Sequence, residues 1–316
     1  MHAAVLRYFD RVARLGSIRR AAESLNVASS AVNRQILKLE AETGTALFER
    51  QRTGVALTAA GEVLLRHARE TLIDYDRARA DMATLSGNVT GNVRIISLES
   101  LIVRFMPRVV AEIAEAYPQL TLTVVVVDPS AITDELRSGR NDFGVLFVDK
   151  RHSRVDVAES YPTAIGAVMR PDHPLASRRK LTLTECAKHP VVMLNDRWLL
   201  DGVMAAEFAG SGARIAPRFV SNSIDFMRQI ILSGLGIGFF TPIGFLDEIA
   251  RGELVHVPLA ESGLADSAIG ILVPQDRRPT LAGRIVMDMV AVRLREFAAT
   301  MNRPAGSGRP RGARKR

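Results

Sequence analysis

The sequence has very little cysteine and no long uninterrupted hydrophobic run. Cys186 is the only cysteine among 316 residues, so no disulfide can form within the chain, and its helix-like surroundings indicate a packing residue. The most apolar later stretch, residues 230–246, is broken by Gly234, Gly236, Gly238 and Pro242, which argues against a membrane span. Residues 7, 10, 11 and 14 are charged, which excludes a signal peptide at the N-terminus. We therefore expect a cytoplasmic protein with no membrane partner.

Several enzyme motifs are missing as well. The sequence has no Gly-x-Ser-x-Gly elbow, no His-Glu-x-x-His and no Cys-x-x-Cys, and its six histidines are not spaced as metal ligands. The glycines of Gly234-x-Gly236-x-Gly238 precede a strand instead of following one, so they do not form a dinucleotide-binding loop. We therefore expect no catalytic residue, no metal and no cofactor.

Positive charge is concentrated at the two ends of the chain. Residues 1–59 carry a net charge of +4, residues 60–88 and 89–302 carry −1 each, and residues 303–316 contain six basic residues and no acidic one. This distribution favours a nucleic-acid contact at the N-terminus and a ligand-binding module behind it. The basic tail, residues 303–316, has too few apolar residues to fold, and it is either an additional phosphate contact or a solvated extension.

Residues 17–39 predict two short amphipathic helices joined by a tight turn. Ser17 is suited to cap the first helix, and Ala21, Ala22 and Leu25 form its apolar stripe. The turn falls at residues 26–27, and the second helix restarts at residue 28 or 29 with an inward face of residues 32, 36 and 39. This pattern is typical of a helix-turn-helix that places its second helix in the DNA major groove.

The outward face of the second helix carries side chains that can read bases. Asparagine and glutamine pair with adenine, arginine pairs with guanine, and serine binds bases or phosphate. After this helix, the basic segment 50–55 predicts a wing that turns at Gly54 and contacts phosphates or the minor groove. A solvated helix face and an ordinary hairpin are the alternatives. The predicted DNA-binding residues are Ser29, Ser30, Asn33, Arg34, Gln35, Lys38, Arg50, Arg52 and Thr53.

Residues 60–88 predict one long helix with a heptad seam. The seam runs through residues 64, 68, 71, 75, 78, 82 and 85. Because several of these residues are small or polar, the seam is weak alone, but it is long enough to pair with a second copy. Two DNA-reading heads on one duplex then imply a pseudo-palindromic operator.

From residue 93 onward strands and helices alternate, which predicts an α/β fold with parallel sheets. The first strand–helix group has strands at 93–96, 120–127 and 143–147 and helices at 104–116 and 132–137. A second such group runs from 165 to about 258, and the chain then returns with a strand at 268–273 and a helix at 280–299. Residues 89–302 are thus expected to form two lobes, lobe I of 89–163 and 268–302 and lobe II of 164–267.

Residues 6–61 resemble the winged helix-turn-helix of LysR-type transcriptional regulators. The matching positions include Ala21-Ala22, Arg34-Gln35-Ile36, Leu39-Glu40, Leu47-Phe48-Glu49-Arg50, Leu57-Thr58 and Gly61. Later segments also match, among them 136–142, 173–176 and 234–238, so the resemblance extends to about residue 300. The chain departs from the family at base-reading positions, with Ser29-Ser30 in place of Gln-Pro and Asn33 in place of Ser.

The resemblance implies a DNA-binding domain at 1–59, a linker helix at 60–88 and a solute-binding-type effector domain at 89–302. It implies a regulator that binds double-stranded operator DNA as a homodimer or homotetramer under the control of a small-molecule effector, and it leaves RNA polymerase open as a further partner. The alternatives are a ligand-sequestering sensor and an α/β enzyme fused to a DNA-binding head.

An effector in such a fold binds between the lobes, at the carboxyl ends of strands and at helix N-termini. The resemblance places an effector-contacting hydroxyl at Ser100. Pro129 removes an N–H where relatives that bind anions offer a donor, and Asp128 adds negative charge, so a simple carboxylate effector is disfavoured. The predicted effector-binding residues are Ser97, Ser100, Asp128, Ser130, Phe147, Asn222, Phe240 and Thr241.

Overall fold

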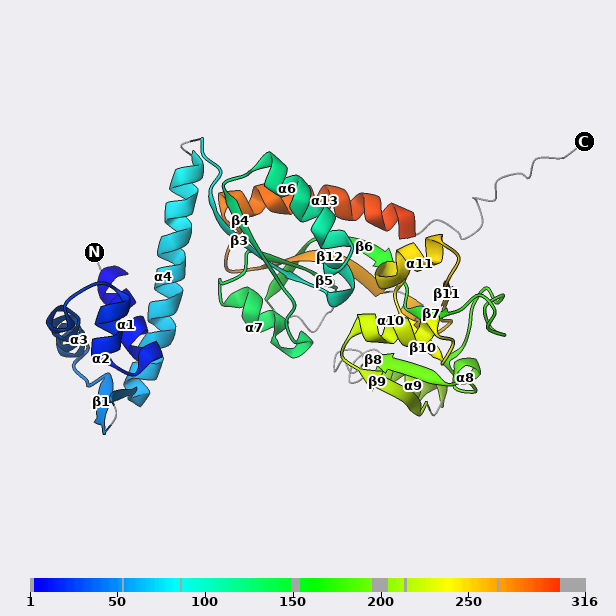
Figure 1. Ribbon diagram of the computed structural model, residues 1–316, viewed down its shortest axis with the longest axis horizontal. Coiled ribbons are helices and arrows are strands. Elements are labelled where there is room, and N and C mark those ends of the chain that lie inside the picture. The colour runs from blue at the N-terminus through cyan, green and yellow to red at the C-terminus, as the bar shows by residue number, and fades with distance from the viewer. Residues whose placement is uncertain are drawn as a thin grey trace, which may run out of the picture. The chain divides into compact units, whose positions relative to one another are not determined.

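The computed structural model describes residues 3–52, 54–85, 87–148, 154–194, 204–212, 215–265 and 267–301. The chain divides into two compact units at residues 88 and 89, with residues 138–140 grouped with the first unit. Each unit has a fold of its own (Figure 1). Among the described residues no helix is long and apolar enough to cross a membrane.

The N-terminal unit is a helix-turn-helix followed by a β-hairpin and a long helix. Ser17 caps the second helix by accepting a hydrogen bond from the backbone N–H of Arg20, at 3.4 Å. Asn26 has a positive φ of 53°, a conformation that asparagine tolerates, and this turn sets the angle between the second and third helices. The elements are α1 (Ala3–Leu15), α2 (Ile18–Ser24), α3 (Ser29–Thr43), β1 (Phe48–Gln51), β2 (Gly54–Leu57) and α4 (Ala59–Leu85).

One hydrophobic core holds this unit together. Val32, Ile36 and Leu39 of α3 are buried in it, as their spacing predicts, together with Ala21 and Ala22 of α2. Phe9 of α1 and Phe48 of β1 pack edge to face, with their ring centroids 5.2 Å apart. The beginning of α4 enters the same core through Leu65 and Ala68, so only the later half of the predicted heptad seam is free of this core.

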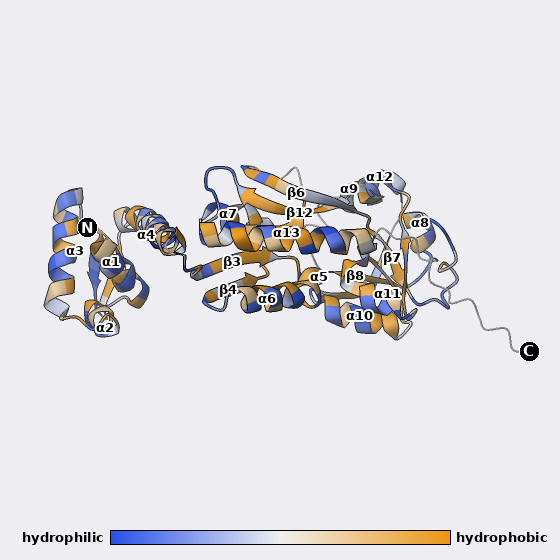
Figure 2. Ribbon diagram, turned by 90° about the horizontal axis from the view of Figure 1, so that it is seen from above, coloured by the Kyte–Doolittle hydropathy of each residue, from blue (hydrophilic) through white to orange (hydrophobic). Residues whose placement is uncertain are grey.

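Lobe I of the second unit is built on a five-stranded sheet in the order β4-β3-β5-β12-β6. Helices α6 and α13 cover it, and Figure 2 shows hydrophobic residues concentrated along its strands. The elements are β3 (Gly91–Ser97), α5 (Glu99–Ile102), α6 (Phe105–Ala116), β4 (Leu120–Val125), η1 (Pro129–Ala131), α7 (Ile132–Arg137), β5 (Phe143–Phe147), β6 (Val155–Thr163), β12 (Ser267–Pro274) and α13 (Leu281–Met301).

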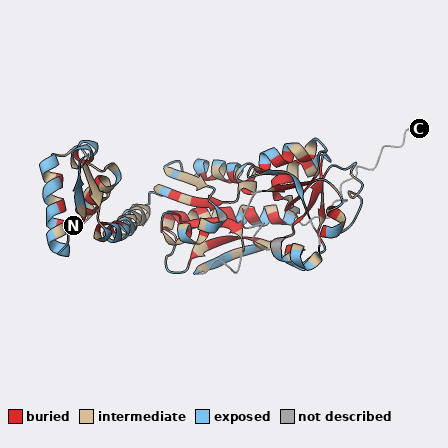
Figure 3. Ribbon diagram, turned by 90° about the horizontal axis from the view of Figure 1, so that it is seen from below, coloured by how far each residue is buried: buried red, intermediate tan, exposed pale blue. Residues whose placement is uncertain are grey.

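Lobe II contains the other five-stranded sheet, in the order β11-β7-β10-β8-β9, and its three central strands are buried (Figure 3). Cys186 is fully buried in the core of this lobe, as expected of a packing residue, and burial raises the pKa of its thiol to about 12. The elements are β7 (Gly166–Met169), α8 (Leu183–Cys186), β8 (Val191–Leu194), α9 (Met204–Ser211), β9 (Pro217–Ser221), α10 (Ile224–Leu232), β10 (Ile237–Phe240), η3 (Pro242–Phe245), α11 (Leu246–Ala250), β11 (Val255–Pro258) and α12 (Ser262–Ala265).

The predicted parallel pairing is confirmed for β3, β4 and β5, but it does not extend to every strand of the two sheets. β3, β4 and β5 are parallel, but β12 is antiparallel to both β5 and β6, and β7 is antiparallel to β10. The reason is the double crossing between the lobes. β6 carries the chain out of lobe I and β12 brings it back, so Thr163 and Ser267 lie paired in opposite directions at the crossing. β6 itself was missed by the sequence patterns.

Candidate functional site: a DNA-binding helix and a ligand cleft

The polar face of α3 is the candidate DNA-binding surface. Ser29, Ser30, Asn33, Arg34 and Lys38 are exposed, whereas Gln35 is half-buried beside the apolar face. Lys38 lies 3.8 Å from Glu42, and the guanidinium of Arg34 has no hydrogen-bond or ion-pair partner among the described residues. An exposed guanidinium without such a partner can form a bidentate contact with a guanine edge, and no hydrogen bond within the described part of the protein has to break first.

The hairpin next to α3 has the geometry of a wing. β1 and β2 pair antiparallel from Phe48–Leu57 to Gln51–Gly54, and Thr53 at its turn lies outside the described residues. Arg50 and Arg52 are exposed, and neither has a charged partner in the described part of the chain. The hairpin therefore presents two cations that are available for phosphates.

Glu40 fixes the hairpin to the end of α3. Its Oε1 atom accepts hydrogen bonds from the backbone N–H groups of Leu47 and Phe48, at 2.8 and 3.1 Å. The sequence comparison matched Glu40 to the family but assigned it no role. A carboxylate at this helix end satisfies the first donors of the strand, so it sets the position of the wing relative to α3.

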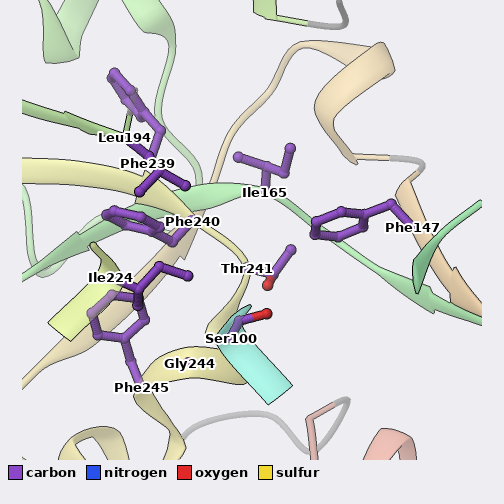
Figure 4. Close-up of a pocket in the computed structure, with 10 residues that line it drawn as sticks. All are labelled: Ser100, Phe147, Ile165, Leu194, Ile224, Phe239, Phe240, Thr241, Gly244 and Phe245. Atoms are coloured by element: carbon purple, nitrogen blue, oxygen red, sulfur yellow. The ribbon is translucent and has the colours of Figure 1, made fainter. Parts of the chain in front are cut away.

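A cavity lies between the lobes of the second unit, with a volume of about 50 Å³. Lobe I contributes Ser100 at α5 and Phe147 at the end of β5, and the remaining residues come from the crossing and from lobe II (Figure 4). The ends of β8 and β10 and the start of α10 meet here, as expected for the carboxyl ends of parallel strands. The lining residues are Ser100, Phe147, Ile165, Leu194, Ile224, Phe239, Phe240, Thr241, Gly244 and Phe245.

Four of the eight residues predicted to bind an effector line this cavity, namely Ser100, Phe147, Phe240 and Thr241. The other four have different positions. Ser97 is buried and donates to the carbonyl of Leu98, and Asn222 is exposed one residue before Ser223, which caps α10. Asp128 and Ser130 bond each other at the start of η1, with the backbone N–H of Ser130 2.8 Å from the Asp128 carboxylate.

Polar contacts join lobe I to the helices α10 and α11 of lobe II. Glu99 in lobe I accepts a hydrogen bond from the backbone N–H of Ile224, at 3.0 Å, and so occupies the N-terminus of α10 in lobe II. Arg104 in lobe I forms ion pairs with Asp247 and Glu248 of α11. Sequence reasoning missed these contacts, because their partners lie more than 120 residues apart.

Comparison with known proteins identifies the family. Residues 4–62 match the bacterial regulatory helix-turn-helix domain of the lysR family, and residues 86–295 match the LysR substrate binding domain. The chain belongs to the LysR family of transcriptional regulators. It is thus a DNA-binding regulator that combines a helix-turn-helix with an effector-binding domain.

Two curated relatives of this LysR-type regulator extend over most of its length. The uncharacterized HTH-type transcriptional regulator YvbU of Bacillus subtilis is 25% identical over 285 residues, which cover 90% of this chain and 96% of YvbU. The RuBisCO operon transcriptional regulator of Allochromatium vinosum is 29% identical over 239 residues, or 75% of this chain and 79% of that protein. Both are named as regulators, which favours the regulator over the enzyme and sequestration alternatives.

The fold of the LysR-type regulator also matches a solved structure, full-length CbnR in complex with its target DNA. The TM-score is 0.62 at 18% sequence identity, and the match covers 94% of this chain and 99% of CbnR. At this identity the comparison supports the fold alone.

One half-buried histidine of the LysR-type regulator, His256, contacts β10, the strand that ends at the cleft. The Nε2 atom of His256 lies 3.1 Å from the carbonyl oxygen of Phe240, so Nε2 carries the hydrogen and donates it. Burial lowers the pKa of His256 to about 4, although hydrogen bonds to the backbone at Phe240 and Ala164 oppose the shift. The neutral ring therefore holds the end of β10 in place at neutral pH.

This shift predicts a loss of stability in mild acid. The unfolded chain takes up a proton on His256 near pH 6.5 and the folded chain only near pH 4, so the stabilisation is complete above pH 6.5 and is lost as the pH falls. Between pH 7 and pH 5 the loss amounts to about 2 kcal/mol. Urea unfolding at both pH values should show this difference in the wild type and a smaller one in His256→Gln. Equal pH dependence in both proteins would contradict the role of His256.

Proposed function

We propose that this protein binds a pseudo-palindromic operator as a dimer, inserts α3 of each copy into the major groove, and changes its operator affinity when an effector enters the cleft between the lobes. The observation that carries the proposal is the polar face of α3, where Arg34 and Asn33 are exposed and uncommitted while the opposite face is buried. The match of residues 4–62 to the bacterial regulatory helix-turn-helix domain of the lysR family supports this use of the domain.

The N-terminus of α3 and the wing supply the phosphate contacts in this proposal. The N-cap of α3 is Ala28, which has no side-chain acceptor, so the first N–H groups of the helix are open to a phosphate next to Ser29 and Ser30. Arg50 and Arg52 reach the adjoining backbone from the wing. These contacts orient the helix, and the side chains of Asn33, Arg34, Gln35 and Lys38 read the bases.

The later half of α4 is the proposed dimer contact. Tyr75, Met82 and Leu85 are between 42% and 77% exposed, although they continue the apolar seam that begins in the N-terminal core. Pairing with the same helix of a second copy would cover them and join two DNA-reading heads. A dimer of dimers and a contact with RNA polymerase would extend the same assembly, which acts in the cytoplasm because its target is the operator.

Selection from a random pool of duplex DNA tests this proposal without knowledge of the target genes. The full-length protein should enrich sequences with two half-sites related by a dyad and separated by about one helical turn or a multiple of it. Recovery of unrelated sequences, or binding with no sequence preference, would contradict it. Sedimentation of the protein with the enriched duplex then gives the number of copies bound.

A further inference from the structure

Another cavity joins the two lobes and shares no described lining residue with the cleft. Helices α6 and α13 of lobe I form one side of it, and η3 and α11 of lobe II form the other (Figure 1). This helix groove has a volume of about 390 Å³, which lies within the roughly 300–1,000 Å³ of typical small-molecule sites. It is therefore large enough for a ligand of its own.

The floor of the helix groove is apolar. Phe105, Val109 and Ile243 line it, although each is no more than 5% exposed to solvent. Phe105 packs against Phe297, with the two ring centroids 5.1 Å apart. All four side chains belong to the hydrophobic core of lobe I or pack against it. The groove thus leaves core surface open to a ligand, whose apolar body would be stabilised by leaving water.

The carboxylates among the described lining residues are each bonded to an arginine. Asp247 forms an ion pair with Arg104, and Glu112 and Glu296 both pair with Arg293, at 2.7 and 2.8 Å. A positively charged ligand would have to displace one of these arginines before it gained a charge-assisted bond of its own. The ion pairs therefore disfavour a cation in the helix groove.

Arg108 is the lining arginine without a carboxylate partner. Its side chain is exposed on α6 and has no hydrogen-bond or ion-pair partner among the described residues. Glu112, one helical turn further along α6, is bonded to Arg293 instead. A guanidinium binds a carboxylate through two parallel N–H···O bonds, so Arg108 can hold an anionic group at the edge of the apolar floor.

We propose that the helix groove is a second ligand site, separate from the cleft, and that it binds an amphipathic anion, a molecule with one carboxylate on an apolar body. Arg108 binds the carboxylate, and Phe105, Val109 and Ile243 bind the apolar body. The groove, its free guanidinium and its apolar floor carry this assignment without reference to the proposed function.

The segment η3 separates the helix groove from the cleft. Ile243 lines the groove, whereas the next residues, Gly244 and Phe245, line the cleft. A ligand in the groove contacts lobe I and lobe II at once, so its affinity depends on the spacing of the lobes. By linkage, its binding changes the affinity of the cleft for an effector and the affinity of the protein for its operator. This coupling, unlike the site itself, rests on the proposed function.

Calorimetric titration of the full-length protein with octanoate, octanamide and octylamine tests the site. The three probes share one alkyl chain and carry a negative charge, no charge and a positive charge at neutral pH. We expect octanoate to bind at least about tenfold more tightly than the other two, because it alone forms a charge-assisted pair with Arg108. Arg108→Gln should reduce octanoate binding to the level of octanamide, and Arg108→Lys should restore part of it.

Two further variants serve as controls. Arg179→Gln removes the same charge from an exposed position of lobe II that lines neither cavity, and it should leave the ratio unchanged. Ala250→Phe places a ring in the groove from an exposed position, and it should weaken all three probes. Equal binding of the three probes, an unchanged ratio in Arg108→Gln, unchanged octanoate binding in Ala250→Phe, or no octanoate binding at millimolar concentration would each overturn the proposal.

Operator binding by the same preparations separates the site from the proposed function. Saturating octanoate should shift the operator dissociation constant of the wild type at least about fivefold and leave that of Ala250→Phe unchanged. Selective octanoate binding without this shift would refute the coupling alone. Absence of operator binding by the ligand-free wild type would refute the regulator and leave the site in place.

Discussion

Replacement of Arg34 by alanine should reduce operator affinity at least about 30-fold and leave both units folded. Arg34 is exposed on α3 and has no partner within the described residues, so its removal disturbs no contact of the protein core. One bidentate arginine–guanine contact contributes about 1–3 kcal/mol of discrimination, and a dimer on a symmetric operator loses two of them. Gel-shift titration of the selected operator and of a scrambled duplex measures the change.

Two further variants separate base reading from charge. Arg66→Ala removes the same charge from an exposed position of α4, and it should leave operator discrimination unchanged. Arg34→Lys keeps the charge but lacks the planar fork, so it should bind the scrambled duplex normally and still discriminate poorly. Full operator affinity in Arg34→Ala would show that α3 does not read bases through this residue. Wild-type discrimination in Arg34→Lys would show that Arg34 contacts only a phosphate.

Gly61→Ala should destabilise the N-terminal unit by about 3 kcal/mol or more and abolish operator binding. A Cβ at Gly61 would lie 2.1 Å from the carbonyl oxygen of Leu47 and 2.8 Å from the side chain of Leu57. Since the first contact is with backbone, the start of α4 must move away from the rest of the unit. Helix propensity alone predicts the opposite sign, a gain of about 1 kcal/mol, so tertiary packing decides the result.

Gly44→Ala serves as the comparison within the same unit. Gly44 ends α3 with a φ of +69°, but nothing lies within 4 Å of its Cβ position, so the cost is confined to backbone strain of about 1–2 kcal/mol. Thermal unfolding followed by circular dichroism should rank the wild type, Gly44→Ala and Gly61→Ala in that order of decreasing stability. A Gly61→Ala protein as stable as the wild type would show that the approach of α4 to Leu47 is not required.

Local sequence patterns predicted the structure correctly where the contacts of a segment lie within a few residues of one another. The inward face of α3 at Val32, Ile36 and Leu39 and the Ser17 cap agree with the structure. Helical periodicity and capping depend on residues three or four apart, so the sequence expresses them directly. The family resemblance came from short motifs in both domains and is confirmed by the matched domains.

The cleft was predicted only in part, because polar residues at strand ends were favoured over apolar ones. Ser100 and Thr241 face the cavity, but Asp128 and Ser130 bond each other instead, an ordinary use of aspartate and serine at a turn. The apolar residues of the wall, among them Ile165 and Phe245, could not be distinguished in sequence from core residues. Which strand end faces the other lobe depends on how the two sheets are joined.

The sequence by itself determined the helix-turn-helix, the order of the α/β elements and the class of the protein, because periodicity, caps and short motifs are properties of neighbouring residues. Only the tertiary structure decided the antiparallel return of β12, the contact of Glu99 with α10 and the ion pairs of Arg104 with α11. These features join residues more than 100 positions apart. Their partners are selected by the paired crossings between the lobes, and no local pattern encodes that geometry.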